Sequence, residues 1–333
     1  MTADLISVEN LTLRFKTDEG LVTAVDDVSF SVAPGQVLGL VGESGSGKSV
    51  TAKSLMKLNA DNGVYGDRSR IKLHTDGETL DVLKLRKPKE LLPVRGGAIS
   101  MIFQEPMASF APAIRIGDQM VEQLMLHTRK KKADAKQHAI DMLDRVGIPD
   151  PAIRFGQYAF ELSGGMRQRA MIAMALSTHP KLLIADEPTT ALDVTIQAQV
   201  IDLMKDLVAE FGMGIIFITH DLGVIAQTAD RVAVMYLGKL VEQGPVRDVI
   251  RNPMHPYTQG LLKALPKLDD LEAPLEPVPG DIPSPLERPS GCVFNTRCSH
   301  SFAKCIVDTP IMSDFGNDHS TACHVVKERA EAA

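Results

Sequence analysis

Short apolar runs alternate with helical patterns from residue 8 to about residue 249, which is typical of α/β proteins. The run at 36–41 has the length of a buried strand, and a glycine-rich turn separates it from a helical pattern at about 48–58. Two more apolar runs, at 181–186 and 214–219, are also typical of buried strands. The pattern therefore predicts a sheet core with helices between its strands.

Four further segments complete the pattern. Between the last two strands, apolar residues recur at helical spacing up to Gly212, which is expected to end that helix. From roughly 114 to 147 the pattern is helical with no clear strand, which predicts a helical insertion. Seven prolines fall between 266 and 289, so we expect a stiff linker at 266–290. The segment 291–326 beyond it contains all four cysteines, and we expect the linker to separate it from the α/β core.

The composition is that of a folded protein, since 44% of the 333 residues are apolar and 23% are charged. The net charge of −6 argues against a nucleic-acid binder, which normally carries a basic surplus. No apolar run approaches the roughly 18 residues of a membrane span. The first residues lack the basic flank and apolar core of a secretion signal. We therefore expect a cytoplasmic protein that reaches a membrane only through a partner.

The glycine-rich turn matches the phosphate-binding pattern G-x-x-x-x-G-K-[ST] in full, as Gly42-Glu43-Ser44-Gly45-Ser46-Gly47-Lys48-Ser49. It also stands between a predicted strand and a predicted helix, the context in which this Walker A motif binds nucleotides. Glycines let backbone N–H groups turn toward the phosphates, and the helix N-terminus favours negative charge. Lys48 is expected to bridge the β- and γ-phosphates of ATP, and the Ser49 hydroxyl to bind Mg²⁺. The alternative is a surface turn, which the Lys-Ser pair in this context disfavours.

Two carboxylates stand where the strand at 181–186 ends, which is the edge where open α/β sheets bind ligands. Asp186 is suited to hold Mg²⁺ through water, and Glu187 to polarise the attacking water. Gln104 and His220 each follow an apolar run, from which an amide oxygen and an imidazole can reach the metal and the γ-phosphate. Alone, an Asp-Glu pair is often a solvated loop, and a lone Gln or His is usually structural. The upstream phosphate-binding motif favours the catalytic interpretation.

A second phosphate-binding helix start is predicted at Leu162-Ser163-Gly164-Gly165-Met166-Arg167-Gln168-Arg169. Ser163 can cap the helix that follows, and the two glycines leave backbone N–H groups open to an anion. An ATP held between two subunits needs only one such helix start from each of them, whereas this chain has two. The octet resembles the signature motif of ABC transporter ATPases, in which the signature of one subunit closes over the Walker A motif of another.

The order of the remaining motifs resembles the same family. Gln104 corresponds to its Q-loop, Asp186-Glu187 to its Walker B motif, Ala191-Leu192-Asp193 to its D-loop and His220 to its switch histidine. The resemblance covers 5 to about 265. It implies an ABC-type nucleotide-binding domain over 5–265, with a mixed sheet core and a helical subdomain at about 105–165.

The resemblance also implies a role for each matching residue. The catalytic residues are Glu187, His220 and Gln104. The residues that bind ATP are Phe15, which stacks on adenine, and Gly42, Ser44, Gly45, Ser46, Gly47, Lys48, Ser49 and Asp186. Mg²⁺ is held by Ser49, Gln104 and Asp186. The residues that act on the ATP of the partner are Ser163, Gly164, Gly165, Met166 and Asp193.

Three features resemble the dipeptide and oligopeptide branch of importer ATPases: the run from 184 to 197, the sequence His255-Pro256-Tyr257-Thr258, and the cysteine-bearing tail. The chain departs from the family with Phe15, where Tyr is frequent, and with Phe110-Ala111-Pro112 after the Q-loop. Residues after the Q-loop face the membrane subunits in the family, so the transported solute is less firmly implied than the ATPase chemistry. Residues 65–97 match the family poorly and receive no role.

The four cysteines, Cys292, Cys298, Cys305 and Cys323, are separated by 6, 7 and 18 positions. Structural disulfides are not expected in a cytoplasmic chain. The spacing lacks the short Cys pairs of most zinc sites and does not match a standard ferredoxin, so an iron–sulfur cluster, zinc and free thiols all stay open. Resemblance to the peptide-importer tail, which holds a 4Fe-4S cluster, favours the cluster, with zinc as the alternative. The nearby His300, His319 and His324 are expected to be solvated.

The resemblance further implies a set of partners. These are a second, related ABC ATPase subunit, two transmembrane permease subunits and an extracytoplasmic solute-binding protein, with no nucleic acid. The chain would lie at the cytoplasmic face of the inner membrane, held by the permeases. Alternatives are import of a sugar, nickel or an opine, a non-transport ABC-type ATPase in DNA repair or translation, and an iron–sulfur redox protein.

Overall fold

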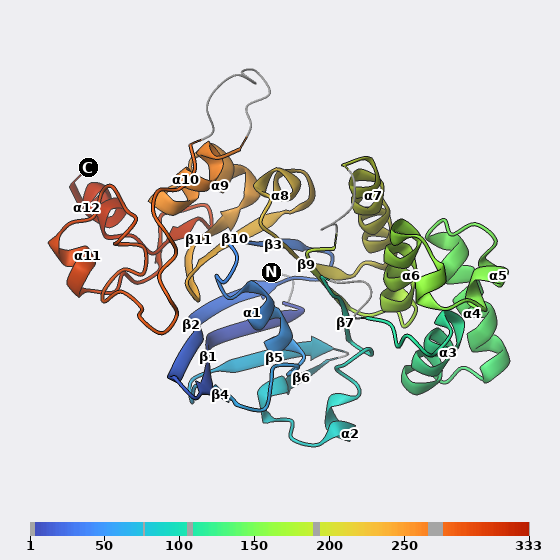
Figure 1. Cartoon of the computed structure of the whole chain (residues 1–333). Helices are drawn as coiled ribbons and strands as arrows, with labels where there is room; N and C mark the ends of the chain where they lie inside the picture. Colours follow the sequence, from blue (N-terminus) through green and yellow to red (C-terminus); the bar gives the residue numbers. More distant parts are fainter. Residues whose placement is uncertain (1–3, 76, 105–108, 189–193, 266–275, 333) are drawn as a thin grey trace. The chain divides into compact units, whose positions relative to one another are not determined.

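The computed structural model of the chain describes residues 4–75, 77–104, 109–188, 194–265 and 276–332 (Figure 1). The chain divides into two compact units. Unit 1 consists of Met1–Ile6, Val32–Gln36 and Lys72–Ile218. Unit 2 consists of Ser7–Ser31, Val37–Ile71 and Thr219–Ala333. Each unit has its own strands and helices.

The main sheet of unit 2 is mixed. β3 (Val37–Val41) lies parallel to β10 (Arg231–Tyr236), and β11 (Lys239–Pro245) runs antiparallel to β10. Two short strands from the C-terminal segment, β13 (Ser320–Thr321) and β12 (Ser313–Asp314), extend this sheet beyond β11. The cysteine-bearing segment is therefore part of the same sheet as β3.

A second group of strands in unit 2 consists of β1 (Ile6–Thr17), β2 (Gly20–Val32) and β4 (Gly63–Tyr65), in which β1 pairs with both neighbours. Buried positions mostly alternate with more exposed ones along β1, as in a strand with one face on a core. The helices of unit 2 are α1 (Lys48–Leu55), α8 (Leu222–Thr228), α9 (Val246–Arg251), α10 (Pro256–Lys263), α11 (Ala303–Val307) and α12 (His324–Ala332).

Three parallel strands form the core of unit 1. They are β7 (Ile99–Ile102), β8 (Leu182–Asp186) and β9 (Gly214–Thr219), with β8 in the middle. Every residue in them is buried, as expected for parallel strands covered on both faces. Unit 1 also contains the antiparallel pair β5 (Arg70–Thr75) and β6 (Glu78–Asp81), then the short helices η1 (Val82–Lys84) and α2 (Pro88–Leu91).

The remainder of unit 1 is helical. Its elements are α3 (Ile116–His127), α4 (Lys132–Arg145), α5 (Pro151–Phe155), η2 (Ala159–Glu161), α6 (Gly164–Leu176) and α7 (Val194–Phe211). Helix α4 packs against α3, α5 and α6, and the four helices form the green group in Figure 1. Several apolar side chains of α3 and α4, among them Met120, Leu124 and Leu143, are fully buried. No helix in the described part of the chain is long and apolar enough to cross a membrane.

The elements confirm the α/β pattern and the helical insertion. The predicted strands at 36–41, 181–186 and 214–219 correspond to β3, β8 and β9, and both ends of each agree within one residue. The helix predicted up to about 58 ends earlier, at Leu55, since Lys57 has a left-handed backbone conformation that stops it. Helix α7 ends just before Gly212, whose φ of 61° fits a glycine at a helix terminus.

Candidate functional site

The phosphate loop, residues 42–49, connects β3 to α1 in unit 2. Gly42 and Gly47 have φ of 152° and 100°, a region that other residues rarely adopt. A Cβ on Gly42 would lie 2.2 Å from the Met235 carbonyl oxygen, and one on Gly47 would lie 2.7 Å from the Ala24 carbonyl oxygen. The loop therefore requires glycine at both positions for its conformation and for its close approach to neighbouring backbone.

Lys48 is held by the loop that it belongs to. Its Nζ donates hydrogen bonds to the carbonyl oxygens of Gly42, at 2.7 Å, and Glu43, at 2.9 Å. The Ser46 hydroxyl lies 3.4 Å from the same Nζ, and both side chains are buried. Ser44 and Gly45 are exposed, and Ser49 is half-buried in the first turn of α1. The predicted phosphate ligands are thus arranged around one loop, with Lys48 folded back onto its carbonyls.

Two residues that contact Glu43, Arg297 and Tyr257, received no role from the sequence. The Arg297 guanidinium forms two hydrogen bonds with the Glu43 carboxylate, at 2.7 and 3.1 Å. The Glu43 N–H donates to the Tyr257 hydroxyl at 2.9 Å. Tyr257 belongs to the His-Pro-Tyr-Thr sequence, which the resemblance marks but to which it gives no role; Arg297 stands directly before Cys298 and carries no sequence signal.

Phe15 and His220 are the remaining predicted site residues of unit 2. Phe15 is half-buried on β1 opposite Gly63. His220 is exposed between β9 and α8. Asp221 caps α8 by accepting hydrogen bonds from the N–H groups of Gly223 and Val224, which fixes the backbone next to His220.

Unit 1 brings Gln104 and Glu187 together. Because β7 and β8 are parallel and pair Ile102 with Ala185, the residues just beyond them lie at the same sheet edge. Gln104 Nε2 donates a 2.8 Å hydrogen bond to Glu187 Oε2. The Glu187 backbone has φ 47°, a left-handed conformation that is unusual for a non-glycine residue, and its N–H donates to Ile218 O at 2.9 Å. Asp186, at the end of β8, is 3% exposed.

The predicted signature motif begins a helix in unit 1. Ser163 is the N-cap residue of α6, and its hydroxyl accepts from the Met166 N–H at 3.3 Å. Ser163 and Gly164 are exposed, so this helix N-terminus is open to an anion. The buried Gln168 side chain, one turn further, donates to the Pro188 carbonyl next to Glu187. Asp193, predicted to act with this motif, lies outside the described residues.

The four cysteines lie within the C-terminal part of unit 2 and form no disulfide. Cys292 and Cys305 are buried, and the Cys292 N–H donates to Cys305 O at 2.8 Å. Burial raises the pKa of the Cys292 thiol to about 11, repulsion from the other three thiols adds to that rise, and a backbone hydrogen bond at Phe294 opposes it. Among the described residues, no three His, Cys, Asp or Glu side chains are grouped to hold a single metal ion.

Two of the tail histidines are buried, which corrects the expectation that they are solvated. His319 lies 2.7 Å from the fully buried Glu242 carboxylate. His324 Nε2 lies 2.9 Å from Asp308 O. Both histidines therefore hold the C-terminal segment in place, because a buried imidazole requires a polar partner.

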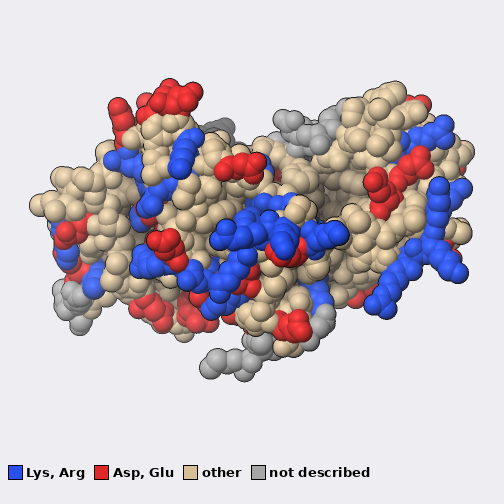
Figure 2. Space-filling view, turned by 90° about the horizontal axis from the view of Figure 1, so that it is seen from below, with Lys and Arg blue, Asp and Glu red and all other residues tan. Residues whose placement is uncertain are grey.

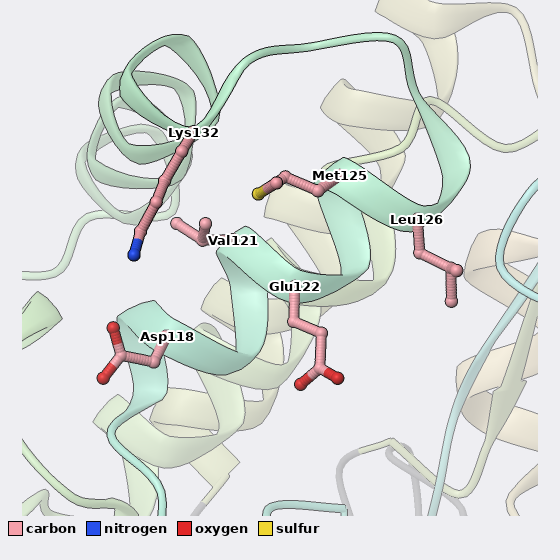
Figure 3. A pocket seen from close by; sticks show the side chains of 6 residues that line it. All are labelled: Asp118, Val121, Glu122, Met125, Leu126 and Lys132. Carbon is pink, nitrogen blue, oxygen red and sulfur yellow. The ribbon is translucent and has the colours of Figure 1, made fainter.

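A surface pocket of about 700 Å³ lies on α3 in unit 1 (Figure 3). Figure 3 shows Val121 and Met125 turned toward the side chain of Lys132, while Leu126 leaves α3 on the other side. Met125 and Leu126 are 48% and 56% exposed, although both are large and apolar. Exposed apolar side chains rimmed by charged ones are typical of a contact surface. The lining residues are Asp118, Val121, Glu122, Met125, Leu126 and Lys132.

Basic and acidic side chains are mixed on the displayed face (Figure 2). In Figure 2, Asp and Glu groups interrupt the Lys and Arg groups on this face. The net charge of −6 adds no basic surplus.

Two protein-family models match the chain. The model described as ABC transporter matches residues 25–190. The model described as oligopeptide/dipeptide transporter, C-terminal region, matches residues 241–305. The second match includes Tyr257, Arg297 and three of the four cysteines, while Cys323 lies beyond it.

Similar proteins and structures extend over most of the chain. A protein of Brucella abortus named as a peptide import ATP-binding protein is 48% identical over 326 residues, which are 96% of each chain. A protein of Brucella melitensis with the same kind of name is 49% identical over 313 residues, 94% of this chain and 92% of the relative. A dimeric structure of a bacterial ABC transporter cassette is 25% identical, with a TM-score of 0.63 over 73% of this chain and 99% of that one. CbiO1 of Clostridium perfringens, part of an ABC transporter complex, is 25% identical, with a TM-score of 0.60 over 75% of this chain and 91% of that one.

Proposed function

The chain belongs to the family of ABC transporter ATPases, and we propose that its ATP hydrolysis drives an importer of dipeptides or oligopeptides. The likeness to peptide import ATP-binding proteins over 96% of both chains carries this proposal. The match of residues 241–305 to the C-terminal region of oligopeptide/dipeptide transporters supports it independently of the ATPase motifs.

In the proposed ATP site, the N–H groups of residues 42–49 and the Lys48 ammonium hold the phosphates, and Phe15 stacks on the base. The hydrogen bonds to the loop carbonyls hold the Lys48 ammonium inside the loop. When ATP binds, Lys48 must exchange these hydrogen bonds for bonds to phosphate. Ser49, Gln104 and Asp186 would hold Mg²⁺, which neutralises charge on the phosphates. Hydroxyl, amide and carboxylate oxygens are the ligands that Mg²⁺ prefers.

Glu187 is the proposed general base. Its carboxylate accepts from Gln104 at one oxygen, Oε2, so the hydrogen bond orients it at the sheet edge. A carboxylate within hydrogen-bond reach of a water can take its proton as the water attacks the γ-phosphorus. His220 would hydrogen-bond the γ-phosphate and stabilise the charge that develops there.

The signature residues Ser163, Gly164, Gly165 and Met166, with Asp193, are proposed to act on ATP held by a second, related ATPase subunit. The exposed N-terminus of α6 supports this role, since it presents unshielded N–H groups to solvent. Two permease subunits and an extracytoplasmic solute-binding protein complete the proposed importer, with the chain at the cytoplasmic face of the inner membrane. The apolar rim of the α3 pocket, Met125 and Leu126, is the proposed permease contact.

The cysteines Cys292, Cys298, Cys305 and Cys323 are proposed to hold a 4Fe-4S cluster, with zinc as the alternative. Each sulfur of such a cluster site binds a different iron, so the four sulfurs stand farther apart than the ligands of one ion. Repulsion from the other three thiols helps to raise the pKa of Cys292, so the four side chains lie near one another. Backbone hydrogen bonds to the sulfurs of Cys292, Cys298 and Cys323 would stabilise bound thiolates. When bound, the cluster would cross-link the segment as a structural element.

The test is reconstitution of the chain in liposomes with two permease subunits and a related second ATPase subunit. ATP hydrolysis should rise when a binding protein loaded with a dipeptide or oligopeptide is added. Stimulation by a sugar-, nickel- or opine-loaded binding protein would support the transport ATPase function but assign it to that solute instead of a peptide. Failure to assemble with any membrane protein would instead favour a non-transport ABC-type ATPase.

A further inference from the structure

Glu43, the second residue of the phosphate loop, is held at three points. Its carboxylate forms the two hydrogen bonds with Arg297. Its N–H donates to the Tyr257 hydroxyl at 2.9 Å. Its carbonyl accepts from Lys48 Nζ at 2.9 Å. The residue that orients the Lys48 ammonium is therefore itself fixed by two residues from outside the loop.

Arg297 is rigidly placed. Its side chain is 3% exposed, and its remaining N–H groups donate to the carbonyls of Pro279, at 2.9 Å, and Val278, at 3.1 Å. It also lies against the Tyr236 ring, 5.7 Å from the centroid. A guanidinium that donates in several fixed directions holds its carboxylate partner in one geometry. The loop is thus attached to the proline-rich segment and to the cysteine-bearing segment through one side chain.

Tyr257 is placed by the same C-terminal segment. Its ring packs 5.4 Å from the ring of Phe294, which lies between Cys292 and Arg297. The Tyr257 N–H donates to His255 Nδ1, and the His255 N–H donates to Glu242, the partner of His319. Because Tyr257 is fully buried, a shift of the C-terminal segment would displace its hydroxyl from the Glu43 N–H.

Glu43 also carries a charge of the wrong sign for its position. A carboxylate within the loop that receives ATP repels the phosphates, and the repulsion is strong where water is partly excluded. Arg297 cancels that charge at a distance of 2.7 Å. Loss of the arginine would therefore both loosen the loop and expose the ATP phosphates to an uncompensated carboxylate.

We propose that Arg297 and Tyr257 are positioning residues for ATP, through which the cysteine-bearing segment sets the shape and charge of the phosphate loop. The proposal rests on the ATPase function and adds to it a dependence of nucleotide affinity on the C-terminal segment. Neither residue touches the nucleotide; both act through Glu43. The C-terminal segment is expected to affect ATP binding rather than the hydrolysis step, because Glu187 and Gln104 are not part of these contacts.

The test compares ATP binding and steady-state hydrolysis in the full chain carrying Arg297→Gln, Glu43→Gln, both changes together, and Tyr257→Phe. Arg297→Gln should raise the Kd and KM for ATP on the order of tenfold, with kcat changed less than about twofold. The double variant should bind ATP more tightly than Arg297→Gln alone, because the uncompensated carboxylate is gone. Tyr257→Phe should raise the Kd without altering any charge.

Arg231→Gln is the matched control, since Arg231 also bonds the C-terminal segment, at Asp318, without contact to the loop. It should leave ATP affinity unchanged. Wild-type affinity in both Arg297→Gln and Tyr257→Phe, or no recovery in the double variant, would overturn the proposal. If Arg297→Gln does not fold, Tyr257→Phe decides it, because this variant releases the Glu43 N–H without altering any charge. A raised Kd then supports the proposal, and a wild-type Kd overturns it. Failure of wild-type protein to bind ATP at all would instead overturn the ATPase function.

Discussion

Gln104 Nε2 donates a 2.8 Å hydrogen bond to Glu187 Oε2, and the two residues follow adjacent parallel strands. The bond links the Q-loop to the proposed general base without any nucleotide. It leaves the amide oxygen of Gln104 as the atom that can face a metal ion or water. One residue therefore orients the base through its nitrogen and is suited to bind Mg²⁺ through its oxygen.

Glu187→Gln should lower the rate of ATP hydrolysis on the order of 10²–10⁴-fold, because an amide cannot take the proton of the attacking water. ATP binding should persist, since the phosphate loop is unchanged. Steady-state hydrolysis and nucleotide binding are measured on the same preparation. Glu210→Gln, which removes an exposed carboxylate of the same unit, is the control. A Glu187→Gln variant with a third of wild-type activity would exclude Glu187 as the base.

Gly165→Asp should stop ATP-dependent dimer formation. The carboxylate would enter the first turn of α6, at the helix start that is proposed to receive the γ-phosphate of the partner subunit. Nucleotide binding by the isolated chain should survive, because the phosphate loop is a different segment. Size-exclusion chromatography with ATP, in a Glu187→Gln background that prevents hydrolysis, measures the dimer. Loss of binding by the isolated, folded variant would mean that the motif acts on the chain's own ATP.

Leu126→Asp should reduce co-purification of the chain with the permeases. Leu126 is 56% exposed beside the α3 pocket, so a charge there costs the monomer little but would be buried in a permease contact. ATP binding and the thermal unfolding temperature should not change. Val307→Asp, at an apolar residue that is 75% exposed on α11, is the control. Equal recovery of permease with both variants would exclude this part of α3 as the contact.

The strands and the residues around Glu187 could be predicted from the sequence because each is specified locally. A fully apolar run such as 182–185 has few alternatives to a buried strand, and carboxylates that follow it must lie at the sheet edge. The glycines of the phosphate loop are specified by backbone geometry in the same way.

The contact of Arg297 with Glu43 could not be predicted, since the two residues are 254 positions apart and neither belongs to a charged pattern. The strands β12 and β13 have two residues each, too few for any periodicity to show. The packing of the proline-rich segment could not be predicted either. Proline predicts an extended backbone but not whether its carbonyls pack, and those of Val278 and Pro279 accept from Arg297.

Stability should fall as the pH is lowered from about 6.5 to about 4, in part because of His255. Burial lowers the pKa of His255 to about 4, and the Glu242 charge opposes this only in part. In that window the unfolded chain binds a proton at His255 that the folded chain does not, so acid favours unfolding, by about 3 kcal/mol over the whole window. Below pH 4 this contribution is constant.

His255→Asn isolates the effect. Asparagine keeps an acceptor for the Tyr257 N–H, so the cap of α10 is retained while the titrating group is lost. The free energy of unfolding from urea titrations at several pH values should then decrease less steeply between pH 6.5 and 4.5 than in the wild type. Glu242 and His319, which lie next to this position, are the same in both proteins. Identical slopes would show that His255 does not titrate as expected.

Anaerobically purified protein should be brown, with broad absorbance near 400 nm and about four irons per chain, if Cys292, Cys298, Cys305 and Cys323 hold a 4Fe-4S cluster. A zinc site would be colourless, with about one metal ion per chain. Cys298→Ser should lose the iron and make the cysteine-bearing segment more sensitive to protease, because thiolate–metal bonds supply much of the folding free energy of a small segment.

The same variant should also weaken ATP binding, because Arg297 stands next to Cys298 and holds Glu43. Lys304→Gln, which breaks an exposed ion pair with Glu328 in the same segment, should change neither iron content nor ATP affinity. Colourless, metal-free wild-type protein that assembles fully with the permeases would exclude both metals. Iron loss in Cys298→Ser with unchanged ATP affinity would show that Arg297 keeps its place without the cluster, so that the fold of unit 2 alone fixes the phosphate loop.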